Sequence, residues 1–550
     1  MPYDIRVRTF REGLKKLIYS KPYVLILLLT ALCGYGFRIV WPVIGIDDTL
    51  YDDYFNGGLA PYMGRWVLFL LGRVLKFTDF APFATEFISV IVFMAAVTVF
   101  AVLFLRIFWE DIPFFGYILF SCIFLSSPIH SEVFSYFLHN GTALGYLLTG
   151  ISLNLLMDSY VHMETNTKPA PYGRLICIAF LVTLSTGLYE SFMIVWILGV
   201  FLSAFSLKLY GRRSFRFVFC GGLTAAASVI FRSLCIRLVL ILFNITTDKE
   251  TARLRSMKEL AGWLASKDAL SDFVMALKRA YVMYFAFMYA YLPVAVFVFA
   301  AFILFFVSIV FLVKKKNVWV LLLFIISSLS CFLLIPIEGK VTLYRSAQFL
   351  PLYCGFGALM LFYCISKIKI ARIISATAAA ILLFNQCMML NRYFYIEYMK
   401  YEEAINVIER IDYELKSSFD ISKPVVFTGL YEVPESLISD AYVEIGSKTF
   451  YRIKRLTDII DPTLLEKFYK KNGVEVAQHP ALSVIEWGRY AFGDSTELIK
   501  FFRMHGMEIN YIKGIDYETM YGIEMDTADM PRFPQEGSVR DFGDYIVVHF

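Results

Sequence analysis

Long apolar runs separated by short polar segments fill the first 390 residues of the chain. A helix needs about 20 apolar residues to cross a hydrocarbon core about 30 Å thick. Eleven runs reach or approach this length, so the pattern predicts a bundle of about eleven membrane spans. The predicted spans are residues 22–44, 82–105, 113–128, 141–158, 174–190, 191–208, 217–243, 284–312, 318–338, 350–367 and 372–390.

Two further segments mix apolar residues with positive charges. Residues 64–76 are too short and too charged for a span, and we interpret them as an interfacial helix. Residues 244–283 contain two short amphipathic stretches among several basic residues. This second segment is either a helix in the headgroup layer or a solvated helical connector.

After residue 390 the composition becomes that of a soluble protein, and helix and strand patterns alternate. The periodicity predicts helices over 393–416 and 495–505, and strands over 423–429, 511–513 and 545–549. The expected fold is mainly α. It consists of a polytopic membrane helix bundle in residues 1–390, followed by a soluble extracytoplasmic α/β domain in residues 391–550.

The charges support this division and suggest an orientation. Hydrophobic residues make up 58% of the chain and charged residues 18%, which excludes a disordered chain and an ordinary cytosolic enzyme. Residues 1–390 carry a net charge of +14, whereas residues 391–550 carry −9. Lys and Arg in short loops mark the cytoplasmic side. They occur at 6–21, Arg106, 168–174, 208–216, 314–316 and 367–372. We therefore expect a cytoplasmic N-terminus and, after an odd number of spans, a C-terminal domain outside a plasma or inner membrane.

A pair of adjacent carboxylates, Asp47 and Asp48, directly follows the first predicted span. Two carboxylates at a membrane edge repel each other, which raises one pKa and favours a general base. The same oxygen ligands, extended by Asp52 and Asp53, suit a divalent cation such as Mg or Mn. The alternative is a solvated acidic loop.

A second outer loop carries Glu132, Tyr136 and Asn140 at intervals of four residues. On a helix this spacing places an acid, a phenol and an amide on one face, which suits a polyhydroxylated ligand. The alternative is ordinary helix capping and anchoring at the interface.

A third candidate is the tight junction that contains Tyr189 and Glu190, between the fifth and sixth predicted spans. A carboxylate near the membrane costs a few kcal/mol on insertion scales, so it is a candidate functional group. The alternative is a structural ion pair with a nearby Lys or Arg.

A fourth candidate is the segment of Lys340, Tyr344 and Arg345, before the tenth predicted span. An Arg on the outer side opposes the positive-inside trend, and its guanidinium can hold a phosphate through two parallel hydrogen bonds. The alternative is pairing with one of the acids named above or extension of the side chain toward water.

The first outer loop also carries a recognisable motif. Ile46-Asp47-Asp48 is followed, after about fifteen residues, by Gly64-Arg65-Trp66 and the predicted interfacial helix. In this motif and in its array of spans, the chain resembles the serotype-converting (Gtr-type) O-antigen glucosyltransferases. These are polytopic membrane glycosyltransferases of the GT-C superfamily.

The resemblance implies transfer of a sugar, often glucose, from a polyprenyl phosphate carrier to a cell-surface glycan on the outer side of the membrane. It implies a base among Asp47 and Asp48, and donor phosphate binding at Arg345, with Tyr344 and Lys340 beside it. Residues expected to bind the sugar or the acceptor are Arg65, Glu132, Tyr136, Asn140, Tyr189 and Glu190. The tail matches no pattern that identifies an acceptor.

The chemistry of transfer asks for few groups. Glycosyl transfer passes through an oxocarbenium-like state, and a phosphate is a good leaving group. One base and one cation therefore suffice, which predicts a single displacement with inversion and no required cofactor beyond an optional divalent cation.

Other classes of membrane protein remain as alternatives. A transporter or flippase of a lipid-linked glycan is expected to place charges near mid-membrane, often in repeated halves. A surface-polysaccharide polymerase usually has one large outer loop, and a receptor needs a cytoplasmic output module. The bilayer, the lipid-linked donor and a surface glycan are the expected partners, with no nucleic acid.

Overall fold

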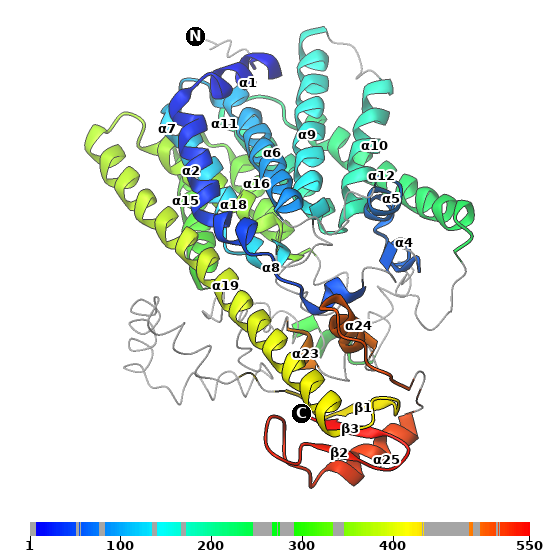
Figure 1. The fold of residues 1–550 in the computed structure, drawn as a ribbon. Coiled ribbons are helices and arrows are strands. Elements are labelled where there is room, and N and C mark those ends of the chain that lie inside the picture. Colours follow the sequence, from blue (N-terminus) through cyan, green and yellow to red (C-terminus); the bar gives the residue numbers. More distant parts are fainter. Residues whose placement is uncertain are drawn as a thin grey trace. The chain divides into compact units, whose positions relative to one another are not determined.

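A computed structural model shows helices along most of the described chain and a small sheet near the C-terminus (Figure 1). It describes residues 7–50, 54–55, 57–75, 83–134, 140–166, 172–245, 267–271, 273–274, 291–333, 346–431, 433, 483–487, 496–512, 515 and 517–550. Most of the segment 244–283 and its predicted amphipathic stretches therefore lie outside the described residues.

Each predicted span contains a helix. These helices are α2 (Lys21–Val40), α6 (Ala84–Phe108), α7 (Phe114–Leu125), α9 (Asn140–Asn166), α10 (Tyr172–Leu188), α11 (Phe192–Leu209), α12 (Phe215–Leu242), α15 (Tyr291–Lys315), α16 (Val318–Ser330), α18 (Phe349–Cys364) and α19 (Lys369–Ser418). A short amphipathic helix, α1 (Phe10–Ile18), precedes them, and its N-terminus is closed by a capping box of Thr9 and Glu12.

Six helices of the described part are long and apolar enough to cross a membrane: α2, α6, α11, α12, α15 and α19. Four others, α7, α10, α16 and α18, are apolar but shorter. Helix α9 is long enough, but polar residues such as Asn154 and Asp158 make it less apolar. The bundle is thus that of a membrane protein, while the number of eleven spans stays a prediction.

Helix α6 lies at the centre of the bundle. It packs against α7 and α9, and its residues from Ala96 to Phe108 are buried on all sides. Aromatic rings fill the space around it, as where Phe104 meets Phe120 and Phe356. An apolar helix that is buried all round belongs to the interior of a bundle, whereas α12 leaves large apolar side chains exposed.

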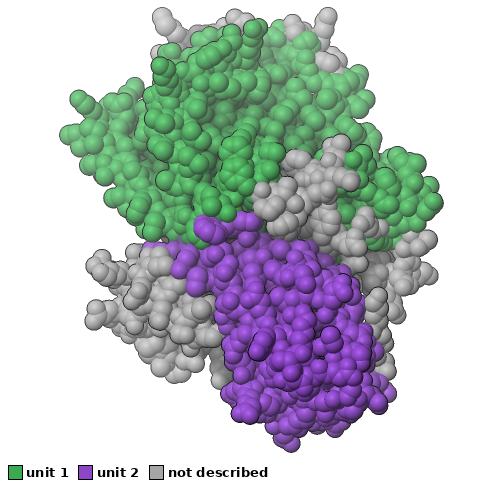
Figure 2. Space-filling model, viewed as in Figure 1, with its two compact units in different colours: residues 1–40, 54–391, 466–477 green, residues 41–53, 392–465, 478–550 purple. Residues whose placement is uncertain are grey.

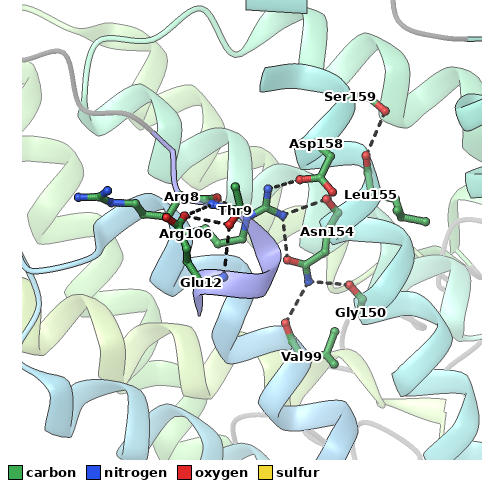
Figure 3. A network of polar contacts seen from close by, with 10 residues as sticks. All are labelled: Arg8, Thr9, Glu12, Val99, Arg106, Gly150, Asn154, Leu155, Asp158 and Ser159. Atoms are coloured by element: carbon green, nitrogen blue, oxygen red, sulfur yellow. Dashed lines mark hydrogen bonds and ion pairs between the residues drawn. The ribbon is translucent and has the colours of Figure 1, made fainter. Parts of the chain in front are cut away.

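Arg106 corrects one expectation, because it does not lie in a cytoplasmic loop. It is in the last turn of α6 and its side chain is buried (Figure 3). Its Nε donates to the Arg8 carbonyl at 2.8 Å, and its Nη1 donates to the Asn154 side-chain oxygen at 3.1 Å. Its Nη2 pairs with Asp158. The charge is inside because three partners on two other segments compensate for its lost hydration.

The predicted boundary between a last span over 372–390 and a separate helix over 393–416 is also wrong, because α19 is one continuous helix. No Gly or Pro occurs near the boundary to break it. The polar Asn391 is accommodated because its side-chain amide donates to the Cys387 carbonyl at 2.9 Å, one turn back.

The chain forms two compact units (Figure 2). The described residues of 1–40 and 54–391 form unit 1, the helix bundle. Those of 41–53, 392–465 and 478–550 form unit 2. Unit 2 thus joins the C-terminal part to a short stretch of the first loop, and the domain limits expected from the sequence stay a prediction.

Unit 2 contains a three-stranded sheet in the order β1-β3-β2. Strand β1 (Val425–Thr428) pairs in parallel with β3 (Ile546–His549), and β2 (Val539–Asp541) pairs with β3 in the antiparallel direction. The helices beside it are α23 (Val484–Trp487), α24 (Thr496–Met504) and α25 (Tyr517–Thr527). Met520 and Ile523 of α25 pack on Val426 and Val547.

The predicted strands over 423–429 and 545–549 and the helix over 495–505 are confirmed. The strand over 511–513 is not found as such, since Tyr511 makes only an isolated bridge to Val425 and Lys513 lies outside the described residues. A small α/β arrangement therefore follows the bundle.

Candidate functional site

The Gly64-Arg65-Trp66 motif forms a tight connection between α4 (Leu59–Tyr62) and α5 (Trp66–Leu75). Gly64 has a φ of 81°, a left-handed conformation that a residue with a Cβ adopts only with strain. The amide of Arg65 donates to the Ala60 carbonyl at 2.8 Å and closes the turn. The predicted interfacial helix over 64–76 is confirmed as a helix in α5.

Arg65 is held by aromatic and acidic partners. Its Nη1 donates to the Tyr54 hydroxyl at 2.5 Å, and its guanidinium lies 4.4 Å from the centre of the Tyr189 ring. Its Nε lies 3.9 Å from a carboxylate oxygen of Glu190. Burial raises the pKa of Tyr54 to about 12, so that phenol stays protonated near neutral pH.

A second arginine binds the same carboxylate. Arg232 of α12 donates from Nη2 to Glu190 Oε1 at 3.0 Å and to the Gly64 carbonyl at 3.3 Å. The Glu190 side chain is 40% exposed, that of Arg232 26% and that of Arg65 11%. We call Arg65, Glu190 and Arg232 the two-arginine cluster; its formal charge is positive.

Two glycines make this approach feasible. A Cβ on Gly64 would lie 1.9 Å from Arg232 Nη2 and 2.9 Å from Glu190 Oε1. A Cβ on Gly187 would lie 2.5 Å from Trp66 Nε1. The motif around Arg65 and the junction around Glu190 therefore fit together only because both surfaces lack a side chain at the contact.

The site has more hydrogen-bond donors than acceptors. Among the described residues, the Nε of Arg65, the Nε of Arg232 and the indole nitrogen of Trp66 are buried without an acceptor. Gln348 adds its amide nitrogen, while its side-chain oxygen accepts from Ser191 at 2.8 Å. Buried donors without acceptors are rare, and a surplus of them favours an anionic ligand.

Gln348 follows the fourth candidate segment, that of Lys340, Tyr344 and Arg345, and anchors its C-terminal end in the bundle. Its backbone carbonyl accepts from the Tyr146 hydroxyl at 2.6 Å, directly before α18 begins. Lys340, Tyr344 and Arg345 themselves lie outside the described residues. Their expected contact with phosphate stays a prediction.

Asp47 and Asp48 lie in a short 3-10 helix, η1 (Ile46–Leu50), which belongs to unit 2 and packs against α24. Asp48 is buried, and its carboxylate accepts from the Gly45 amide at 2.7 Å. Asp47 is more exposed. Asp52 and Asp53 lie outside the described residues, and the described part contains no group of three His, Cys, Asp or Glu residues suited to a metal.

The second candidate segment is described only in part. Glu132 lies in α8 (His130–Phe134) and Asn140 begins α9, whereas Tyr136 lies outside the described residues. The expectation that these three residues share one helical face stays a prediction.

His130, at the start of α8, is fully buried against Phe93 and Tyr146. Burial lowers its pKa to about 3, so the imidazole is neutral at physiological pH. Its Nε2 lies 3.0 Å from the Phe124 carbonyl and must donate that bond, because a carbonyl only accepts. A neutral, donating imidazole serves the packing of the bundle.

Sequence reasoning missed Arg232, although a signal was present. Arg232 lies inside an apolar helix of 28 residues, where an arginine is costly and needs a purpose. The other candidate residues lie at the ends of predicted spans, whereas Arg232 lies within one.

The apolar helices indicate a membrane protein, and the two-arginine cluster gives it a positively charged group with unused hydrogen-bond donors. The family model described as glucosyl transferase GtrII matches residues 36–362, well over half of the chain. The chain therefore belongs to this family of glucosyltransferases, as the sequence motif predicted. No curated protein and no solved structure matches it at a significant level.

Proposed function

We propose that this protein transfers glucose from a polyprenyl phosphate carrier to a cell-surface glycan on the outer side of the membrane. Membership of the glucosyltransferase family supports the transferred sugar. The observation that carries the choice of carrier is the two-arginine cluster, whose surplus donors suit a phosphate and whose Arg232 belongs to a helix with exposed apolar side chains.

The exposed face of α12 supports a lipid-linked donor. Ile230, Leu234 and Leu238 recur every four residues and are each more than half exposed. This spacing forms an apolar stripe along one helix face, which suits acyl or prenyl chains. Arg232 lies in the same turns of α12 but on the side of the helix away from that stripe, where it contacts Gly64 and Glu190.

The reaction needs a base and a cation. The acceptor hydroxyl oxygen attacks C1 of glucose, its proton passes to an aspartate, and the bond from C1 to the phosphate oxygen breaks with its electron pair. We assign the base to Asp47, because it is more exposed than the buried Asp48 and so is more accessible to an acceptor hydroxyl. This single displacement inverts the anomeric configuration.

The proposal is tested with the purified full-length protein, labelled polyprenyl phosphate-glucose and a panel of purified surface glycans. We expect label to pass to a glycan from the lipid-linked donor, with UDP-glucose inactive in its place. Loss of a general base costs about 10²–10⁴-fold in rate. We therefore expect this loss for Asp47→Asn, while Asp541→Asn at an exposed ion pair of the same unit serves as the control.

Several outcomes contradict the proposal. Transfer from UDP-glucose, a retained anomeric configuration, or full activity of both Asp47→Asn and Asp48→Asn each overturns a defined part of it. A chelator in the same assay tests the alternative in which the two aspartates hold Mg or Mn.

A further inference from the structure

Glu190 accepts only part of the hydrogen bonds that the two arginines of the cluster can donate. Its Oε1 accepts from Arg232 at 3.0 Å, but its Oε2 lies 3.9 Å from Arg65 Nε, beyond hydrogen-bond distance. The Nε–H groups of both arginines consequently lack an acceptor among the described residues. A planar carboxylate that leaves donors unused on both guanidinium groups is a poor match for the site.

The surroundings favour an anion with more oxygens than a carboxylate. The Trp66 indole, only 6% exposed, adds another donor without an acceptor next to Arg65 in the sequence. Gly64 keeps the space between Arg232 and Glu190 clear of any side chain of its own. Arginine forks bind phosphate oxygens through paired hydrogen bonds, and a phosphate presents more acceptor sites than Glu190 does.

We propose that Glu190 is an internal counter-ion that holds the phosphate-binding arginines in the unloaded protein and is displaced by the phosphate of the lipid-linked donor. This inference rests on the proposed function and assigns Glu190 a role other than binding of sugar or acceptor. Arg65 and Arg232 then both bind the donor phosphate, in addition to any contact from Arg345, and Glu190 competes with substrate and product for them.

The competition has a use in the reaction cycle. The donor phosphate is a diester with one negative charge, and cleavage of its bond to glucose leaves a monoester with a second charge. Two arginines freed from Glu190 stabilise that added charge. When Glu190 returns to Arg232, it opposes continued binding of the lipid phosphate, which favours release of the product.

The experiment measures binding of geranylgeranyl phosphate, a short polyprenyl monophosphate, to the full-length protein in detergent. Geranylgeraniol tests whether the phosphate is needed, and inorganic phosphate tests whether the lipid is needed. The variants are Glu190→Gln and Arg232→Gln. Glu164→Gln is the matched control, because Glu164 forms a partly exposed pair with Arg216 at 3.9 Å, outside the cluster.

We expect Glu190→Gln to bind geranylgeranyl phosphate about tenfold more tightly than the wild type does. In the wild type the ligand must first break the charge-assisted hydrogen bond between Arg232 and Glu190, and the variant lacks that bond. Arg232→Gln is expected to bind about tenfold more weakly, and Glu164→Gln to bind as the wild type does. Glu190→Asp, which keeps the charge on a shorter side chain, provides a second variant if Glu190→Gln does not fold.

Unchanged or weaker binding by Glu190→Gln overturns the inference, and so does equal binding of geranylgeraniol. If Glu190→Gln also binds inorganic phosphate about tenfold more tightly than the wild type does, the assignment of the site to a lipid-linked phosphate is overturned. If the wild type transfers glucose but Glu190→Gln shows no gain, only this inference fails. If the wild type neither binds the lipid phosphate nor transfers glucose, the proposed function fails.

Discussion

Two clusters in the same helix bundle pair arginine with a carboxylate, and they differ in how completely the arginine is satisfied. Around Arg106, every guanidinium nitrogen donates to an acceptor: the Arg8 carbonyl, both oxygens of Asn154, and Asp158 (Figure 3). In the two-arginine cluster, Arg65 and Arg232 each keep an Nε–H without an acceptor in the described part of the chain.

The difference separates a structural role from a binding role. A buried charge with all its hydrogen bonds made ties the segments that supply them, here the N-terminal segment, α6 and α9. A charged group whose donors are unused destabilises the protein without ligand. A ligand that accepts hydrogen bonds from those donors removes this penalty, which makes its binding free energy more favourable. We therefore infer a structural role for Arg106 and a ligand-binding role for Arg65 and Arg232.

The largest expected effect is on stability and comes from the satisfied cluster. Arg106→Ala leaves Asp158, the Asn154 oxygens and the Arg8 carbonyl without their donor, and removal of one partner of a buried pair costs about 3 kcal/mol. Thermal unfolding of the purified protein measures this loss. Arg216→Ala, in an exposed pair with Glu164, is the control and should cost less than about 1 kcal/mol. Equal losses contradict the comparison.

Gly64→Ala tests the close approach in the two-arginine cluster. The new Cβ has no room beside Arg232 Nη2, so it must move that guanidinium out of the position in which it is proposed to bind the phosphate. We expect transfer to fall about 100-fold, equivalent to about 2.7 kcal/mol. Gly222→Ala in α12 has open space around its Cβ and should keep full activity while gaining up to about 1 kcal/mol of helix stability. A fully active Gly64→Ala refutes the argument.

His130 extends the comparison to a buried group that must stay neutral. Its folded-state pKa of about 3 lies below the unfolded value of 6.5, so only the unfolded state takes up a proton between these values. Stability is therefore intact above pH 6.5 and is lost as the pH falls toward 3, by about 2 kcal/mol between pH 7 and pH 5.

Unfolding temperatures across this pH range should show that slope in the wild type and in His162→Gln. In His130→Gln the slope should be reduced, because the titrating group is gone. A slope that persists in His130→Gln assigns the pH dependence to other groups.

The smallest expected effect comes from Arg65→Lys, which keeps the charge but loses the planar fork. Lysine cannot lie flat on the Tyr189 ring and also reach Tyr54 as arginine does. We expect about a tenfold loss of transfer, or about 1.4 kcal/mol. Arg237→Lys, at an exposed position of α12, is the control. Activity equal to the wild type in Arg65→Lys removes the need for a fork at this site.

Hydropathy located a helix at each predicted span, because lipid demands long apolar runs whatever their neighbours are. It misjudged Arg106 and the α19 boundary for one reason: the polar residues there find partners that no local pattern shows. Asn154 and Asp158 lie about 50 positions from Arg106 in the sequence, and the Asn391 amide also donates to the Cys33 carbonyl of α2, 358 positions away.

The sequence predicted Arg65 and Glu190 as separate candidates but did not predict that they lie in one site. The motif around Arg65 and the junction around Glu190 were both singled out, yet 125 positions separate the two residues and nothing local joins them. Arg232 is a further 42 positions along the chain. The ion pair that was the alternative for Glu190 is present, with Arg232 as the partner. The unused donors of both arginines are the reason to propose a binding role in addition.

By itself the sequence determined the class of the protein, its bundle of apolar helices, the more polar composition of its C-terminal part and the motif of its glucosyltransferase family. These properties follow from composition, periodicity and short motifs, which act over a few residues at a time. The tertiary structure alone decided which charges meet. Packing at Gly64 and Gly187 brings Arg65 and Arg232 onto one carboxylate, and the hydrogen bonds left unmade there are the basis of the phosphate-binding role that we propose.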